Sequence, residues 1–302
     1  MTMIQSPLNY TGGKFKLLPQ ILPLFPQNID TFVDLFCGGG DVGTSVQSNK
    51  VLFNDINSNV IGILNTFKNL SQEDIFVAIK DIISHYSLSD VSTYGYSYYN
   101  CNSSKGVGSY NRESFKRLKD DFNNLQEKTD NYYLLLYVLI VFCFNNQIRF
   151  NKQGKFNLPI GKRDFNAKMQ MKLSAFIERL HGINCEFSSK DFREVAIEGE
   201  STFVYADPPY LITCAAYNEQ GGWSEDLERE LHIYLDKLHT HNIRFALSNV
   251  LTSKGKTNVI LQEWLIHNPQ YICHHLNYNY SNSNYHTAGR ESVSDEVLIT
   301  NY

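Results

Sequence analysis

The chain has 302 residues, a length that fits one large domain or a catalytic domain with a smaller insertion. Its formal net charge of −4 argues against binding nucleic acid through a general basic excess, although a local basic patch is enough to contact phosphates. The six cysteines include no C-x-x-C pair, residues 1–7 lack a secretory pattern and no uninterrupted apolar run reaches about 18 residues, so we expect no metal site, no disulfide framework, no membrane span and a cytoplasmic location.

Short apolar runs and helical patterns alternate along the chain. We expect strands over residues 31–36, 50–53, 184–187, 202–206, 243–247 and 297–300. Helical patterns cover residues 56–70, 71–86, 112–128, 132–144 and 226–239, and another helix ends at Leu180. Residues 87–109, rich in Ser, Tyr, Asn and Gly, are typical of a loop. The alternation predicts an α/β fold in which a mostly parallel sheet carries helices on both faces.

Residues 145–172 differ in character from the rest of the chain. Their only acid is Asp164, and their basic residues are Arg149, Lys152, Lys155, Lys162, Arg163, Lys168 and Lys172. Residues 151–154, N-K-Q-G, would form a turn between two short extended runs, which indicates a β-hairpin. Basic residues interleaved with phenylalanines favour contact with nucleic acid, and an ordinary solvated surface is the alternative.

Glycines follow the first predicted strand. Residues 33–40 have the sequence V-D-L-F-C-G-G-G, so the backbone there can approach a ligand without side chains in the way. Asp55 ends the next strand, where a carboxylate can accept hydrogen bonds from both hydroxyls of a ribose. A nucleoside-type cofactor is indicated, and because the pattern is neither G-x-G-x-x-G nor a Walker motif, a dinucleotide or triphosphate is less favoured. A tight turn followed by a helix-capping aspartate is the alternative.

Two weaker signals flank this region. Residues 10–14, Y-T-G-G-K, form a turn before the first strand, and Asp191 follows the strand near residue 187. A carboxylate at that strand end could meet the amine of a cofactor's adenine. An exposed turn and a helix cap are the structural alternatives for the two signals.

The sharpest signal is Asp207-Pro208-Pro209-Tyr210, at the carboxyl end of the apolar run 202–206. Two prolines fix φ and remove two N–H donors, which leaves the Asp207 carboxylate and the Pro208 carbonyl as rigid acceptors. Two acceptors match the two hydrogens of a planar exocyclic amine and would draw its lone pair towards a methyl sulfonium. Tyr210 offers a ring on which a base can stack. A base inside a duplex would have to be flipped out first.

Together these motifs resemble the Dam-type DNA adenine-N6 methyltransferases of the α (D12) class, most of all their phage-encoded branch. The likeness extends over nearly the whole chain and includes residues 223–226, 247–251 and 295–299. It implies a Rossmann-like doubly wound sheet that binds S-adenosyl-L-methionine, with an inserted, mostly helical target-recognition domain carrying a β-hairpin. We therefore expect a catalytic domain at residues 1–60 and 176–302 and the insertion at residues 61–175.

The resemblance also implies a set of site residues. The target adenine would be held by Asp207, Pro208 and Tyr210. The cofactor would be bound by Tyr10, Gly12, Lys14, Asp34, Phe36, Cys37, Gly38, Gly39, Asp55, Asp191, Phe192 and Asp207. Contacts with double-stranded DNA would come from Phe144, Asn145, Gln147, Arg149, Asn151, Pro159, Lys162 and Arg163.

Two of these DNA-contacting residues have specific roles in the resemblance. Phe144 would wedge into the duplex beside the flipped base, and Arg163 would read a guanine, the pairing that arginine favours in the major groove. The implied target is the adenine of G-A-T-C. The chain departs from the family pattern at Asn145, at Gln147 and over residues 87–109.

Several alternatives remain open. The tetrapeptide suits any flipped planar amine, so the substrate could be the N4 amine of cytosine or an adenine in RNA. A protein of another class, a catalytically silent DNA-binding regulator, would keep the fold without needing Asp207. A partner nuclease is compatible with the sequence. Residues 281–290, with tyrosines nearby, could contact phosphates or form an ordinary hairpin loop.

Overall fold

The computed structural model describes residues 3–10, 12–197, 199, 201–213, 222–277 and 294–302, so the predicted loop 281–290 lies outside the described residues. One central sheet organises this part of the chain, with strands in the order β3-β2-β1-β4-β5-β8-β7 and a short β6 paired to β5. Their bounds are β1 Ile29–Asp34, β2 Ser48–Asn54, β3 Cys185–Ser188, β4 Thr202–Ala206, β5 Arg244–Ser253, β6 Lys256–Thr257, β7 Ile272–Leu276 and β8 Asp295–Thr300.

The sheet is mostly parallel, as predicted. β3, β2, β1, β4 and β5 run parallel to their neighbours, while β8 runs antiparallel between β5 and β7. β1 and β4 lie in register, with Phe32 opposite Phe203 and Val33 opposite Val204. Each predicted strand is present, whereas β7 was not predicted from the sequence.

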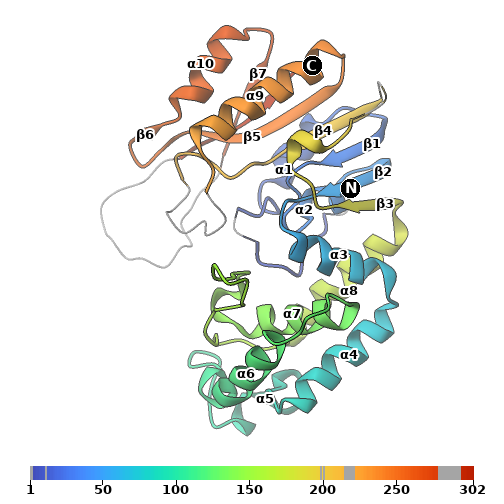
Figure 1. Cartoon of the computed structure of the whole chain (residues 1–302), viewed down its shortest axis with the longest axis vertical. Helices are drawn as coiled ribbons and strands as arrows, with labels where there is room; N and C mark the ends of the chain where they lie inside the picture. The colour runs from blue at the N-terminus through green and yellow to red at the C-terminus, as the bar shows by residue number, and fades with distance from the viewer. Residues whose placement is uncertain (1–2, 11, 198, 200, 214–221, 278–293) are drawn as a thin grey trace.

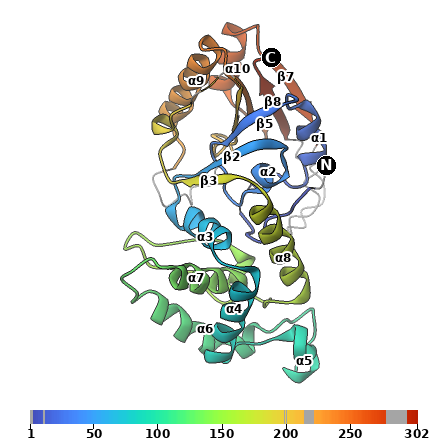
Figure 2. The same ribbon diagram turned by 90° about the vertical axis from the view of Figure 1, so that its right-hand side faces the viewer.

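Helices cover both faces of the sheet, as Figures 1 and 2 show. Side chains alternate along β1, so Phe32 belongs to one hydrophobic core and Val33 to the other. The first core also contains residues of α1 (Leu18–Ile21), α2 (Asp41–Ser45) and α8 (Ala167–Gly182). The second contains residues of α9 (Glu225–Thr240) and α10 (Val259–His267), of which α10 was not predicted.

A mostly helical part, at the lower end of Figure 1, is built from the segment between β2 and β3. Its helices are α3 Ser58–Asn69, α4 Gln72–His85, α5 Val91–Tyr98, α6 Gly108–Phe122 and α7 Asp130–Phe142, which lead into α8. α7 is buried along nearly its whole length and packs against α3, α4 and α6, which explains its continuous apolar sequence. Apolar side chains of α3, α4, α6 and α7 form one core with the side chains on the face of the sheet that α2 covers.

The structure differs from the sequence predictions at two places in this helical part. The segment 87–109, predicted as a loop, contains α5, which begins after the capping side chain of Asp90 and is kinked at Gly95 with φ 72°. The predicted turn at residues 151–154 is present, with Gly154 N–H donating to the Asn151 carbonyl at 2.9 Å. The expected hairpin ladder is reduced to single bridges, Phe150 with Phe156 and Cys143 with Ile160.

Candidate active site

The predicted site residues gather where the parallel strands end. Asp34 ends β1, Asp55 follows β2, Asp191 comes after β3 and Asp207 follows β4. Parallel strands place their carboxyl ends at one edge, where open α/β sheets bind ligands in the crevice at the reversal of strand order. That reversal lies at β1, which has β2 on one side and β4 on the other.

The glycine turn after β1 is closed against its neighbours. Gly38 N–H donates to Asp55 Oδ2 at 2.9 Å, and the Gly38 backbone has φ 47°. A Cβ at Gly38 would lie 2.7 Å from the Tyr10 ring, and one at Gly39 would lie 2.9 Å from Ser6 Oγ. The turn therefore has no room for side chains and presents backbone, as a nucleoside-binding turn requires.

Asp55 is anchored by backbone donors. Its Oδ2 accepts from Gly38 N–H and its Oδ1 accepts from Asn57 N–H at 2.8 Å. Burial raises the pKa of this carboxyl above its ordinary value. Each carboxylate oxygen keeps a lone pair for a further donor, so the predicted contact with ribose hydroxyls is chemically available.

Asp34 is turned inward, towards α2. Its Oδ2 accepts from Gly43 N–H at 2.9 Å, and its side chain is buried. Burial raises its pKa to about 8, so this carboxyl is largely protonated at neutral pH. The neighbouring Cys37 thiol is buried as well, and burial raises its pKa.

Asp191 does not point freely into the crevice. Its two oxygens accept from Arg193, Oδ1 from Nε and Oδ2 from Nη2, both at 2.7 Å. These hydrogen bonds lower the pKa of Asp191. Asp191 Oδ1 also accepts from Arg193 N–H and so begins the short helix η3 (Phe192–Glu194), which is the capping role raised as its alternative. Phe192 is buried and packs 5.6 Å from Phe36, centroid to centroid.

The tetrapeptide after β4 meets the N-terminal turn. Lys14 Nζ lies 2.8 Å from Asp207 Oδ2, and Tyr210 Oη donates to Asp207 Oδ1 at 3.0 Å. The same ammonium donates to the Gly12 carbonyl at 2.8 Å and lies 4.9 Å from the centre of the Tyr210 ring. Pro208 is buried beside them. Lys14, Asp207 and Tyr210 therefore form one cluster, although the sequence had placed Lys14 with the cofactor.

Two effects act in opposite directions on the pKa of Asp207. Burial raises the pKa of Asp207, while Lys14 and the Tyr210 hydroxyl lower it. The Lys14 side chain is only 5% exposed and that of Asp207 17%, so solvent screens the pair weakly. The cluster can present a carboxylate acceptor and an aromatic face to a planar amine, which is the chemistry expected of the tetrapeptide.

The predicted DNA-contacting residues start directly after α7. Phe144 is 52% exposed, and its N–H donates to the Pro159 carbonyl at 2.8 Å. Asn145 has φ 58°, a left-handed conformation that asparagine tolerates. Arg149 Nε donates to Asn157 Oδ1 at 2.8 Å, and Asn151 Oδ1 accepts from two N–H groups of its own turn. Gln147 is half-buried.

The basic stretch keeps most of its charge at the surface. Its single acid, Asp164, is buried and accepts from Ser89 Oγ and Val91 N–H, so it does not neutralise the exposed cations. The exposed basic residues are Lys152, Lys155, Lys162, Arg163 and Lys168. Arg163 Nη1 donates to the Ser103 carbonyl at 3.1 Å, so its guanidinium lies against the connection between α5 and α6.

Two contacts of the site were missed by sequence reasoning. Asn9 Nδ2 donates to the Asn145 carbonyl at 2.8 Å, which links the N-terminal segment to the predicted DNA-contacting residues. Asn54 Nδ2 donates to the carbonyls of Leu35 and Lys190, which ties the ends of β1, β2 and β3 together. The pair N-D at the end of a strand could have suggested the contact of Asn54. No local pattern indicates the contact of Asn9.

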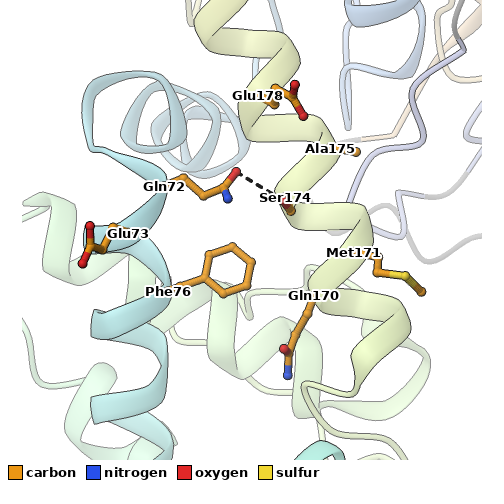
Figure 3. Close-up of a pocket in the computed structure, with 8 residues that line it drawn as sticks. All are labelled: Gln72, Glu73, Phe76, Gln170, Met171, Ser174, Ala175 and Glu178. Carbon is orange, nitrogen blue, oxygen red and sulfur yellow. Dashed lines mark hydrogen bonds between the residues drawn. The ribbon is translucent and has the colours of Figure 1, made fainter.

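A hollow of about 510 Å³ between α4 and α8 lies outside this set, and none of its lining residues was a predicted site residue (Figure 3). Gln72 and Ser174 bridge it by a hydrogen bond of 3.2 Å. Within the described ranges, no three His, Cys, Asp or Glu side chains come together as a metal ion would require. The helices of the same ranges are too short or too polar to span a bilayer.

Known proteins resemble this chain over most of its length. The model of the family described as D12 class N6 adenine-specific DNA methyltransferase matches residues 10–275. The chain is 41% identical to the type II methyltransferase M.FokI of Planomicrobium okeanokoites over 307 residues and 36% identical to the modification methylase StsI of Streptococcus sanguinis over 307 residues. Each match covers 99% of the chain but 43% of the relative, so the chain spans less than half the length of these two proteins. The DNA adenine methylase of Escherichia coli strain K12 is 25% identical over 229 residues, 75% of the chain and 73% of that protein.

Proposed function

Because the chain belongs to the family of D12 class N6 adenine-specific DNA methyltransferases, we propose that it transfers a methyl group from S-adenosyl-L-methionine to N6 of an adenine in duplex DNA. The observation that carries the proposal is the cluster of Lys14, Asp207 and Tyr210 at the end of β4. This cluster stands beside the glycine turn and Asp55, which belong to the two strands on the other side of the crevice.

On the target side, Asp207 and the Pro208 carbonyl would accept the two hydrogens of the adenine amine. Charge-assisted acceptance by the ionised carboxylate favours electron density on the nitrogen that attacks. The Lys14 ammonium lies 4.9 Å from the centre of the Tyr210 ring, on which the base would stack, so the ammonium and the base would share this aromatic side chain. Positioning the amine would supply much of the rate, because a thioether leaves without a strong general base, and the surplus proton of the methylated amine would pass to Asp207 or to solvent.

On the cofactor side, the residues present fit a nucleoside. The backbone of Gly38 and Gly39 offers a surface where no side chain fits, and Asp55 would accept from the ribose hydroxyls. Phe36 and Phe192 would provide an apolar wall. Bound there, S-adenosyl-L-methionine supplies the methyl group on its sulfonium. Tyr10, Gly12, Cys37 and Asp34 complete the proposed surroundings, with Asp34 acting through the backbone it holds. Asp191 would accept from the cofactor through Oδ2, which accepts only from Arg193 Nη2.

On the DNA side, we propose that residues 61–175 form the target-recognition part. The exposed ring of Phe144 would enter the duplex beside the flipped adenine, and Arg163 would read a guanine. The exposed lysines would contact phosphates and make binding fall with added salt. G-A-T-C, the sequence implied by the family resemblance, is the proposed target.

Methylated-base sequencing tests the chemistry and the target together. The chain is expressed in cells that lack adenine methylation, and the DNA is sequenced beside DNA from cells expressing Asp207→Ala. We expect N6-methyladenine in G-A-T-C with the parent chain and near-total loss with the variant. Methylation at another adenine site would reject G-A-T-C alone. A methyl group confined to cytosine or RNA, or activity that survives Asp207→Ala, would reject the proposed reaction.

We also propose that the methylation protects DNA from a partner nuclease. Two relatives with high identity carry the names type II methyltransferase and modification methylase. DNA methylated by this chain should resist a nuclease that cuts the same unmethylated site. Cleavage at equal rates before and after methylation would contradict the protective role without affecting the proposed reaction.

A further inference from the structure

Three aromatic rings from distant parts of the sequence meet beside the carboxyl ends of β1 and β3. The Trp223 ring lies 5.7 Å from Phe36 in an edge-to-face arrangement and 6.1 Å from Phe192, centroid to centroid. Phe36 and Phe192 are residues of the proposed cofactor pocket, whereas neither the sequence nor the proposed function gave Trp223 a role.

A buried carboxylate holds the indole of Trp223 in place. Glu228, in the first turn of α9, is fully buried, and its Oε2 accepts from Trp223 Nε1. Its Oε1 accepts from Nδ2 of Asn249 in β5 and from Nδ2 of Asn258, which caps α10, each at 2.9 Å. The indole is therefore tied to the sheet and to both helices of this face by hydrogen bonds to one charge.

This arrangement exceeds what packing alone requires. Burying a carboxylate is costly, and the cost is offset only when its hydrogen bonds are satisfied. An apolar side chain at position 228 would avoid that cost, but it would leave the indole N–H of Trp223 and two buried asparagine amides without their acceptor. Trp223 also remains half-buried, so part of its ring still faces outwards although its N–H is used. An indole whose N–H is satisfied presents only aromatic surface, which suits the flat face or edge of a purine.

We propose that Trp223 is the third ring of the cofactor-adenine pocket and that Glu228 is the residue that positions it. The inference rests on the proposed use of S-adenosyl-L-methionine and names a binding residue beyond those of that proposal. Along the chain, Trp223 ends the connection that leaves the sheet at Tyr210 and enters α9, so the same connection would hold the target base at its start and the cofactor at its end.

The chain offers a matched control because it contains only two tryptophans, Trp223 and Trp264. Trp264 is buried in the same core, and its Nε1 also donates to a carboxylate, Asp236 Oδ1, at 3.0 Å. It stacks on His232, away from Phe36 and Phe192. Each of the substitutions Trp223→Phe and Trp264→Phe thus removes one indole N–H from the same face of the sheet. Only Trp223 has a proposed contact with the cofactor.

The first experiment measures the intrinsic fluorescence and the KM for S-adenosyl-L-methionine. We expect the cofactor to change the emission of the parent chain and of Trp264→Phe but not of Trp223→Phe. The KM for the cofactor should rise roughly twofold to tenfold in Trp223→Phe, the range that one aromatic contact is worth, with kcat at saturating cofactor within about twofold. An unchanged KM in Trp223→Phe, or an equal rise in Trp264→Phe, would overturn the inference.

The second experiment tests the positioning role of Glu228. Glu228→Gln keeps one carbonyl oxygen for the two asparagines and turns an amide towards Trp223, so two donors face each other. Its KM for the cofactor should rise, and adding Trp223→Phe should cause no further rise because the opposing N–H is gone. Fully additive effects of the two substitutions would reject the positioning role. A parent chain that neither binds the cofactor nor methylates DNA would reject the proposed function instead.

Discussion

Lys14→Met should destabilise the folded chain far more than an ion pair of the same length at the surface. The Lys14–Asp207 pair and the Lys50–Glu186 pair both have a nitrogen–oxygen distance of 2.8 Å. The side chains of the first are 5% and 17% exposed and those of the second 36% and 62%, so two pairs of equal length differ in burial, and Lys14 in addition donates to the Gly12 carbonyl. Lys50→Met is therefore the matched control.

The expected sizes follow from what each substitution leaves behind. Removing Lys14 strands a carboxylate in a poorly solvated place, which costs about 3 kcal/mol, the lower end for a broken buried pair because Asp207 keeps some exposure. Removing Lys50 leaves Glu186 in water, so the loss should stay below about 1 kcal/mol. Urea unfolding of both variants at neutral pH, without cofactor or DNA, measures the difference.

The difference in stability between the parent and Lys14→Met should depend on pH. Burial raises the pKa of Asp207 above its unfolded value, and Lys14 opposes that rise. Without Lys14 the folded carboxyl binds its proton up to a higher pH, so Lys14→Met loses stability relative to the parent as pH rises through that interval. The difference between parent and variant should therefore shrink towards pH 5. A loss no larger than that of Lys50→Met, or a difference that grows as pH falls, would refute the reasoning.

Substitutions at Asp34, Phe144 and Gly38 test other parts of the proposed site. Asp34→Asn should remove a cost in stability that depends on pH, because burial raises the Asp34 pKa from 3.8 to about 8. The parent should therefore lose stability relative to the variant as pH rises over that interval. Free energies of unfolding that change with pH by the same amount in both chains would contradict it. Phe144→Ala should change the free energy of unfolding by less than about 0.5 kcal/mol, since the ring is 52% exposed, yet slow methylation of a matched duplex more than of one with an abasic site opposite the adenine; equal slowing would remove the wedge role. Gly38→Ala should cost about 1–3 kcal/mol because its Cβ would lie 2.7 Å from the Tyr10 ring. Gly255→Ala, also at positive φ but in open space, is its control, and equal losses would show that backbone strain alone is responsible.

The core strands could be predicted because their apolar runs are local. β4 is found at the predicted residues, and all five of its side chains are buried. β7 could not, because Ile272 is 48% exposed and two histidines follow Cys273 in the strand, so no apolar run marks it. α10 was missed for a related reason, since Val259 and Ile266 are 55% and 76% exposed and its apolar residues follow no single helical face.

The residues of the candidate site could be predicted one by one, but their contacts with each other could not. The sequence supplied Lys14, Asp55, Asp191 and Asp207 as separate signals, because each stands next to a strand or turn that a local pattern reveals. It could not say that Lys14 pairs with Asp207 across the crevice, since nothing in either motif refers to the other. For Asp191 the local pattern left a ligand contact and a helix cap open, and it could not show that Arg193 donates to both carboxylate oxygens.

Residues 10–14 were one of the two weaker predicted motifs, and the described residues Tyr10 and Lys14, together with Asn9, contact three parts of the proposed enzyme. The ring of Tyr10 covers the glycine turn, the ammonium of Lys14 contacts Asp207, and the side-chain amide of Asn9 donates to the carbonyl of Asn145. A shift of Asn9, Tyr10 and Lys14 would therefore change the proposed surroundings of cofactor, target base and DNA at once. Binding at any one of these places should change the binding affinity at the other two, because few residues of backbone separate the contacts. The coupling would be visible as a KM for the cofactor that depends on bound DNA and loses that dependence in Asn9→Ala, whereas a dependence unchanged by that substitution would place the coupling elsewhere.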